Sequence, residues 1–343
     1  MTELPTPEQL PPLVEQVIRR RMPNAERATI VEWHRAEHGF GAETYLLALD
    51  GVEGTDDPLG LVFRRPPTAP MFPDYDLRRQ FLVMKRLAAT DIPAPTVRWM
   101  DTDPTDVGSA YLLMDLIPGG RTPSDSPPYH LEGMYVDAAP ADRTRMWWGC
   151  IDTMARLHRL DPAALRLDAL RLHRFGTGPV EQAVNYLDFA VHWAAPQVPP
   201  TIERALTWLR DHCYDPDHVT LCWGDSRLSN VLYGADYSVL GALDWEIGYL
   251  GDHEADLAWL LLTDWVSSEY LSIPRLPGTP SREETIARYK AATGWPVRQL
   301  RFNEILGAVL MALALLRIQV VLGIGDLSAV AVARLDPLLS EGP

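Results

Sequence analysis

The chain has 343 residues, of which 47% are hydrophobic and 22% are charged, the balance of an ordinary globular protein. This length favours two domains or lobes, and the composition excludes a largely disordered chain. Acidic residues outnumber basic residues by 46 to 31, which gives a net charge of −15. That charge argues against a protein that binds nucleic acid or an anionic membrane surface, and it would suit a cationic small molecule.

The cysteines and the apolar segments give no sign of secretion or membrane insertion. Cys150, Cys213 and Cys222 form no CxxC pair, so we expect neither a disulfide framework nor a thiolate zinc site. The N-terminus is proline-rich and acidic, unlike a signal peptide. The most apolar run, residues 305–316, is too short to cross a membrane and predicts a buried helix. We therefore expect a cytoplasmic protein with no membrane partner, whose oligomeric state the sequence does not indicate.

The first third of the chain has mainly the pattern of β-strands. A short helix is expected over residues 13–22, and the β-rich runs that follow cover 28–35, 43–50 and 60–65. A glycine-containing turn separates the first two runs, which is typical of antiparallel strands. The segment 74–89 has helical periodicity, and two further strands are expected over 97–100 and 111–116. The predicted order is three strands, one helix and two strands.

The rest of the chain is mostly helical in pattern. A connector rich in Pro, Gly and Ser covers residues 118–140. The helices expected after it cover 141–159, 179–194, 200–213, 252–264, 281–292, 298–322 and a C-terminal segment, with short strands and a loop over 219–244. These patterns predict an α+β fold with an N-terminal sheet lobe, residues 1–116, and a C-terminal helical lobe, residues 117–343.

The segment Trp223-Gly224-Asp225-Ser226-Arg227-Leu228-Ser229-Asn230 carries the clearest chemical motif, directly after an apolar strand. Asp225 and Asn230 have the D-x-x-x-x-N spacing of a kinase catalytic loop, and Asp244 follows at the end of a later strand. Phosphoryl transfer needs one carboxylate that orients the attacking hydroxyl and further oxygen ligands that hold Mg²⁺. Arg227 lies two residues after Asp225, where a cation can neutralise charge in the transition state.

These motifs resemble those of the aminoglycoside phosphotransferase and choline kinase family, whose fold is similar to that of protein kinases. The loop at 223–230 is close to the family element H-G-D-x-x-x-x-N, and Asp244-Trp245-Glu246 resembles I-D-W-E. Residues 251–258 resemble G-D-P-x-x-D-L-A, and residues 276–284 with Tyr289 match phosphotransferase-like domains attached to some acyl-CoA dehydrogenases. The resemblance covers residues 28–295 and implies a two-lobe protein-kinase-like fold.

The resemblance also implies roles for individual residues. Asp225 would be the catalytic base, and Asn230 and Asp244 would bind Mg²⁺. Gly39, Phe40 and Gly41 would cover the phosphates of ATP or GTP, although a glycine turn alone is also explained by a hairpin. The hinge that binds the purine edge through its backbone would consist of Met114, Asp115 and Leu116. Asp256 would brace the catalytic loop.

The chain departs from the family pattern at three positions. Trp223 replaces the histidine before the Gly-Asp pair, and we expect an aromatic side chain to substitute for it. The phosphate-binding lysine is absent, and strand alternation selects Arg64 as its replacement. The helix glutamate that would pair with it is Gln80, an amide that offers a hydrogen bond without an ion pair, and Asp76 is expected to compensate.

The sequence therefore predicts a Mg²⁺-dependent phosphotransferase that moves the γ-phosphoryl group of ATP or GTP to a hydroxyl of a small molecule. The acceptor stays open among aminoglycosides, macrolides, choline-like amines, hydroxyacyl thioesters and other alcohols. Arg64 and Gln80 also leave open a weak or inactive kinase-like protein that only binds nucleotide. A third alternative is transfer of a nucleotidyl group in place of a phosphoryl group.

Overall fold

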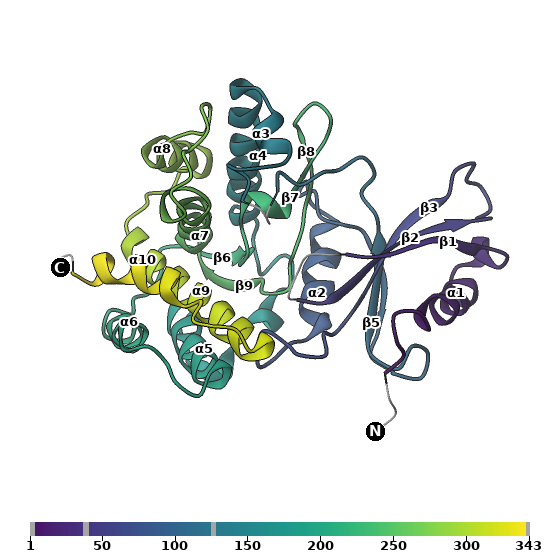
Figure 1. Ribbon diagram of the computed structural model, residues 1–343, viewed down its shortest axis with the longest axis horizontal. Coiled ribbons are helices and arrows are strands. Elements are labelled where there is room, and N and C mark those ends of the chain that lie inside the picture. The colour runs from purple at the N-terminus through teal and green to yellow at the C-terminus, as the bar shows by residue number, and fades with distance from the viewer. Residues whose placement is uncertain (1–3, 37–40, 125–127, 341–343) are drawn as a thin grey trace.

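The structure is a computed structural model that describes residues 4–36, 41–124 and 128–340 (Figure 1). Its N-terminal part is built on one antiparallel sheet with the strand order β1-β2-β3-β5-β4. The strands are β1 (Thr29–Arg35), β2 (Glu43–Asp50), β3 (Leu59–Arg65), β4 (Val97–Asp101) and β5 (Tyr111–Asp115). The α+β fold and the order of these elements agree with the sequence prediction.

The two faces of this sheet are covered by different helices, which lie on opposite sides of it in Figure 1. Because side chains alternate along a strand, Leu61 and Phe63 pack with α1 (Leu10–Arg21), while Val62 packs with α2 (Leu77–Leu87). The 3-10 turn η1 (Pro23–Ala25) follows α1. Helix α2 begins three residues after its predicted start at residue 74, because Asp76 caps it. The Asp76 carboxylate accepts a hydrogen bond from the Arg78 backbone N–H at 2.9 Å.

The C-terminal part is mainly helical. Its helices are α3 (Met134–Asp137), α4 (Pro140–His158), α5 (Pro179–Ala194), α6 (Pro200–Asp211), α7 (Glu254–Trp265), α8 (Arg282–Thr293), α9 (Leu300–Leu322) and α10 (Ala329–Ser340). The single turns η2 (Asp168–Leu170), η3 (His173–Phe175) and η4 (Leu228–Asn230) are 3-10 helices, and η5 (Val266–Tyr270) is a π-helical turn that continues α7. The core helix α9 packs against α5, α7 and α10.

Helix α9 is longer than the apolar run that suggested it. Its 23 residues make it the one helix in the described part of the chain that is long and apolar enough to cross a bilayer, by length and composition alone. Half of its most apolar stretch is buried inside the protein, and the core helix of a soluble protein passes the same test.

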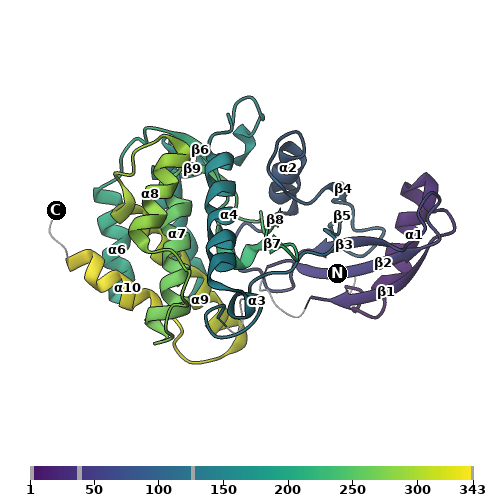
Figure 2. The same cartoon turned by 90° about the horizontal axis from the view of Figure 1, so that it is seen from above.

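Two small antiparallel pairs place the candidate catalytic segments. Strand β6 (Val219–Cys222) pairs with β9 (Tyr249–Asp252), and β7 (Val231–Tyr233) pairs with β8 (Val239–Ala242). In both views the β7–β8 pair lies between α4 and the large sheet (Figures 1 and 2). The loops 223–230 and 243–248 connect these two pairs, so four strands fix the ends of both loops.

Candidate active site

The loop at 223–230 brings Asp225 and Asn230 together, as the spacing predicted. The Asn230 side-chain amide donates to the Asp225 carbonyl at 2.8 Å, which closes the loop. The Asp225 carboxylate accepts from the Trp259 indole Nε1 at 2.7 Å and from Arg227 Nε at 3.2 Å. Gly224 has a φ of +88°, and a Cβ there would lie 2.6 Å from the Ile247 carbonyl oxygen, so only glycine fits. Asp225 is therefore held in a fixed orientation by α7 and by its own loop.

Asp244 lies beside this loop with one carboxylate oxygen left without a hydrogen bond. The Leu243 N–H donates to the Asn230 carbonyl at 2.8 Å, which ties the two segments together. Asp244 has a φ of +63°, unusual outside glycine. Its Oδ1 is buried without a hydrogen-bond partner in the described part of the chain, and Arg64 Nη2 lies 3.7 Å away. Burial, together with the nearby Glu246 carboxylate, raises the pKa of Asp244 to about 7.

These two residues fit a hard divalent cation. The Asn230 amide nitrogen is used by the loop, which leaves the amide oxygen as its ligand atom. The buried Asp244 Oδ1 lacks the partner that a buried carboxylate oxygen requires. Carboxylate and amide oxygens are ligands that Mg²⁺ prefers, so the donor set matches the ion that the sequence predicted.

Arg64 points to the α2 side of the sheet, as the strand alternation predicted. It donates to Thr44 Oγ1 at 3.1 Å and to Gln80 Oε1 at 2.9 Å. It also forms an ion pair with Glu246. The prediction that Asp76 compensates for the missing helix glutamate is wrong, because Asp76 caps α2 and pairs with Arg78.

Glu246 is the acidic partner that the sequence analysis missed. Its Oε1 also accepts from the Ala42 N–H at 3.0 Å, so one carboxylate of the helical lobe holds two groups of the sheet lobe. A Cβ at Gly41 would lie 2.5 Å from Glu246 Oε2, so any larger residue there would displace this carboxylate. Gly39 and Phe40 lie outside the described residues. The D-W-E triplet was the available signal for Glu246, but the sequence does not show which cation it meets.

The predicted hinge joins the end of β5 to the connector. Met114 pairs with Val62 across the sheet. The backbone N–H groups of Asp115 and Leu116 donate to the Thr96 and Gly60 carbonyls, at 2.9 and 3.1 Å. These two amides are therefore used by the sheet, and the predicted contact of this segment with a purine edge stays a prediction.

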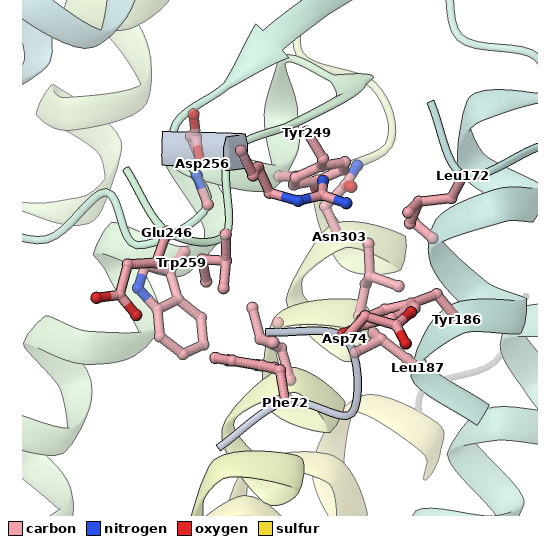
Figure 3. Close-up of a pocket in the computed structure, with 18 of the residues that line it drawn as sticks. Phe72, Asp74, Leu172, Tyr186, Leu187, Glu246, Tyr249, Asp256, Trp259 and Asn303 are labelled. Atoms are coloured by element: carbon pink, nitrogen blue, oxygen red, sulfur yellow. Dashed lines mark hydrogen bonds between the residues drawn. The ribbon is translucent and has the colours of Figure 1, made fainter. Parts of the chain in front are cut away.

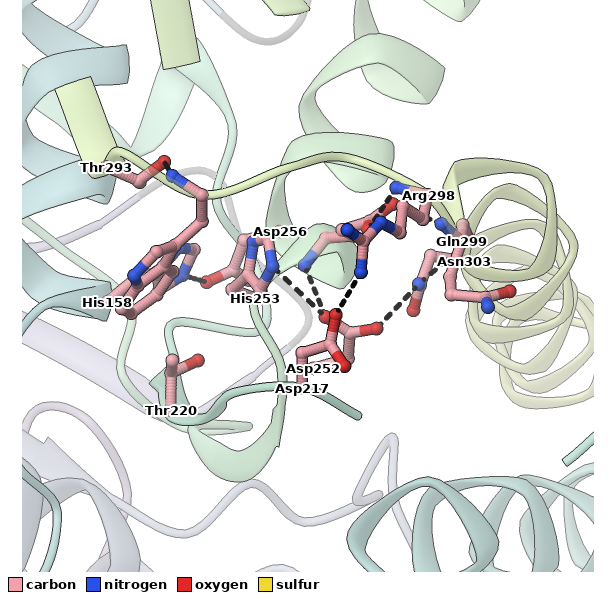
Figure 4. A network of polar contacts seen from close by, with 12 residues as sticks. His158, Asp217, Thr220, Asp252, His253, Asp256, Thr293, Arg298, Gln299 and Asn303 are labelled. Atoms are coloured by element: carbon pink, nitrogen blue, oxygen red, sulfur yellow. Dashed lines mark hydrogen bonds and ion pairs between the residues drawn. The ribbon is translucent and has the colours of Figure 1, made fainter. Parts of the chain in front are cut away.

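A buried network behind the loop at 223–230 braces it, as expected for Asp256 (Figure 4). The Asp256 carboxylate accepts from the backbone N–H groups of Trp223 and Gly224 at 2.6 and 2.9 Å, and lies 2.9 Å from His158 Nε2. The Trp223 indole donates to the Leu243 carbonyl at 2.6 Å and stacks on Trp245. Trp223 therefore links the loop at 223–230 to the loop at 243–248, and its equivalence to the family histidine stays a prediction.

The same network contains a cluster of three potential metal ligands, Asp252, His253 and Glu254. Its carboxylates already have structural partners. Glu254 accepts from the backbone N–H groups of Arg298 and Gln299, at 2.6 and 2.8 Å, where α9 begins. Asp252 accepts from the Glu254 N–H at 3.0 Å and from the Tyr214 hydroxyl. The cluster therefore joins α7 to the start of α9.

Arg64, Asp225, Arg227 and Asp244 line a cleft of about 670 Å³. Asp225, Asp244 and Glu246 are the acidic groups among the described residues that line it. The rest of the wall is mainly apolar and comes from the loop before α2 and from η5 and α9; it includes Met71, Phe72, Val266, Leu310, Met311, Ala314, Leu315 and Ile318. The cleft therefore combines three carboxylates and two arginines with a mainly apolar wall.

Comparison with solved structures supports the fold. A candidate aminoglycoside phosphotransferase from Ralstonia eutropha is similar with a TM-score of 0.68 and 23% identity, covering 95% of both chains. A choline kinase from Cryptosporidium parvum has a TM-score of 0.62 and 14% identity, covering 96% of this chain and 94% of that one. A macrolide 2'-phosphotransferase from Brachybacterium faecium has a TM-score of 0.56 and 18% identity, covering 98% of this chain and all of that chain. These neighbours confirm the two-lobe protein-kinase-like fold.

Curated relatives match over most of this chain but only part of their own length. Acyl-CoA dehydrogenase family member 10 of Mus musculus is 29% identical over 255 residues, which is 73% of this chain and 22% of that protein. Acyl-CoA dehydrogenase family member 11 of Homo sapiens is 27% identical over 241 residues, 68% of this chain and 30% of that protein. The sequence model of the phosphotransferase enzyme family matches residues 32–300, which include Arg64, Asp225 and Asp244. The chain therefore belongs to the phosphotransferase enzyme family.

Proposed function

We propose that the protein transfers the γ-phosphoryl group of ATP or GTP, in the presence of Mg²⁺, to a hydroxyl of a small molecule. The observation that carries this proposal is that Arg64, Asp225 and Asp244 line a single cleft, with Asn230 hydrogen-bonded to the backbone of Asp225 behind it. Phosphoryl transfer depends on positioning and on charge stabilisation, and these groups offer both.

Each group has a separate task in this proposal. Asp225, fixed by Trp259, orients the acceptor hydroxyl and accepts its proton as the oxygen attacks the γ-phosphorus. Asn230 and Asp244 would hold Mg²⁺, which neutralises phosphate charge when bound. Arg64 and Arg227 are cations on the cleft wall that stabilise the phosphate oxygens. The bond from the γ-phosphorus to the bridging oxygen breaks, and the nucleoside diphosphate leaves.

The cleft wall favours an acceptor with an apolar body. Apart from Asp225, Asp244 and Glu246, the described lining residues include no carboxylate that would bind a polycationic acceptor. The apolar side chains of α9 and η5 would gain free energy from burying hydrocarbon, at about 25 cal/mol per Å². Hydroxyacyl thioesters and macrolides fit this wall better than aminoglycosides or choline, despite the net charge of the chain.

The test is a phosphoryl-transfer assay with a panel of hydroxylated acceptors. Purified protein is incubated with Mg²⁺ and either ATP or GTP, and mass spectrometry identifies the group added to each acceptor. We expect one phosphoryl group on an apolar acceptor, and loss of product in Asp225→Asn and Asp244→Ala. The exposed Asp211→Asn serves as the carboxylate control and should stay active. Addition of a nucleotidyl group, or nucleotide binding without any product across the panel, would contradict the proposal.

A further inference from the structure

A second cavity lies beside the active cleft, between α2, α5, α7 and α9 (Figure 3). It has a volume of about 100 Å³. Trp259, Glu246 and Phe72 are among the residues that line both this cavity and the cleft. The indole nitrogen of Trp259 is bonded to Asp225 in the cleft, so this side chain stands between the two spaces.

The wall of this second cavity is mainly apolar and aromatic. The rings of Phe72, Tyr186 and Trp259 surround it together with Leu187, as Figure 3 shows. An apolar cavity of about 150 Å³ in another protein is large enough to bind benzene. This cavity has about two thirds of that volume, so its size and lining suit a smaller hydrocarbon body, of about four carbons.

The carboxylates on the wall of the cavity already have partners. Asp74 pairs with Arg174, and Asp76 pairs with Arg78 at 2.7 Å. Glu246 holds Arg64, and Asp256 is taken up by the loop at 223–230. These carboxylates are therefore already paired and do not favour a cationic ligand.

Arg79 is the exception among the charged groups of the cavity. Its Nη1 donates to the Gly248 carbonyl at 3.1 Å, and no ion pair joins it to any carboxylate in the described ranges. Burial lowers the pKa of Arg79 from its ordinary value, while Asp76 and Asp74 act in the opposite direction. A guanidinium has five N–H donors, so several are left for a ligand. The Tyr186 hydroxyl, which forms no hydrogen bond within the described residues, lines the same cavity.

We propose that this cavity is a second ligand site, separate from the phosphotransfer cleft, that binds a small apolar monocarboxylate. The hydrocarbon body would fill the aromatic space, and the carboxylate would accept hydrogen bonds from the Arg79 guanidinium and the Tyr186 hydroxyl. A ligand there would press on the ring of Trp259 and on the segment 246–248. Trp259 is bonded to Asp225, and Glu246 is bonded to the Ala42 backbone, so both residues also belong to the cleft. Binding of a ligand in the second cavity would therefore be linked to the positions of Asp225 and Glu246 in the cleft.

The test is isothermal titration of the intact protein with pentanoate and cyclobutanecarboxylate, with pentanamide as the uncharged probe. Arg79→Gln removes the cation, and Arg204→Gln is its matched control, because Arg204 is an exposed arginine of α6 whose carboxylate partner, Asp336, does not line the cavity. Ala183→Leu fills the cavity from α5 without touching any charge. Circular dichroism first establishes that each variant is folded, and should Arg79→Gln not fold, Tyr186→Phe, which removes the other proposed donor, takes its place.

We expect at least one of the two carboxylates to bind, with an affinity about tenfold or more weaker in Arg79→Gln because charged hydrogen bonds are lost. Ala183→Leu should weaken binding to a similar degree, and Arg204→Gln should leave it unchanged. Pentanamide should bind weakly and equally to the wild type and to Arg79→Gln. Absence of binding of both carboxylates to the folded wild type would overturn the proposal. Binding that is insensitive to Arg79→Gln or to Ala183→Leu would overturn it as well.

Discussion

Asp256→Asn is expected to destabilise the protein by about 2 to 4 kcal/mol, because the carboxylate of Asp256 joins α7 to the loop that carries Asp225. The Asp256 residue is 1% exposed. One of its oxygens accepts from the Gly224 N–H at 2.9 Å. The other accepts from the Trp223 N–H at 2.6 Å and lies 2.9 Å from His158 Nε2.

The magnitude follows from what an amide can replace at this position. The asparagine oxygen can keep the bond to Gly224, but its NH₂ group then meets the Trp223 N–H, and two donors face each other. A buried donor left without an acceptor costs about 1 to 3 kcal/mol. Loss of the negative charge weakens the remaining bond by about a further 1 kcal/mol. His158 limits the damage, since its ring nitrogen can accept a hydrogen bond from the new NH₂ group by changing tautomer.

Urea unfolding followed by circular dichroism measures this loss directly. A domain is typically stable by about 5 to 15 kcal/mol, so the expected change is a large fraction of the total. Asp211→Asn, at an exposed position of α6, should change the unfolding free energy by less than about 0.5 kcal/mol. A loss in Asp256→Asn as small as that of the control would refute the argument that this carboxylate holds the loop.

Three further changes test other parts of the structure. Ser281→Ala removes the capping box of α8, in which the Ser281 hydroxyl accepts from the Glu284 N–H at 3.1 Å. The free energy of unfolding, measured in urea, should fall by about 1 kcal/mol, and an unchanged value would show that the cap is not needed. Burial lowers the pKa of His253 to about 4. As the pH falls below 6.5, this histidine is therefore protonated in the unfolded chain before it is protonated in the folded protein, which favours unfolding. The wild type should therefore lose about 2 kcal/mol relative to His253→Gln between pH 7.5 and 4.5, and parallel unfolding curves across this range would contradict the buried neutral imidazole. Trp259→Phe removes the 2.7 Å hydrogen bond to Asp225. The kcat of phosphotransfer should fall about 10- to 100-fold while the affinity for nucleotide is unchanged. An unaltered kcat would show that Asp225 does not need the hydrogen bond from Trp259.

The sequence predicted the features that depend on local periodicity. Strand alternation placed Arg64 on the α2 face, where it meets Gln80, because successive side chains of a strand must point to opposite sides. The D-x-x-x-x-N spacing placed Asn230 against Asp225, because one tight loop connects them. The start of α2 was less exact, since the helical pattern extends over residue 74 and only the capping bond of Asp76 shows where the helix begins.

The sequence could not show contacts between segments that are distant along the chain. Glu246 and Arg64 are 182 positions apart, and their ion pair forms only because the sheet lobe and the helical lobe meet at the cleft. Trp259 lies on a helix whose apolar pattern predicts burial, and nothing in that pattern shows that its nitrogen reaches Asp225. The π-helical turn η5 continues the periodicity of α7, so the sequence offered no sign of the change in hydrogen bonding.

The Glu246 carboxylate couples the geometry of the site to the angle between the two lobes. It belongs to the helical lobe, yet it bonds both Arg64 and the Ala42 backbone of the sheet lobe. An anion that draws Arg64 away from Glu246 would remove one of these two links and leave the other. Binding of an anion and rotation of the lobes would then be linked, so that a change in the angle between the lobes would alter the affinity of the site for the anion.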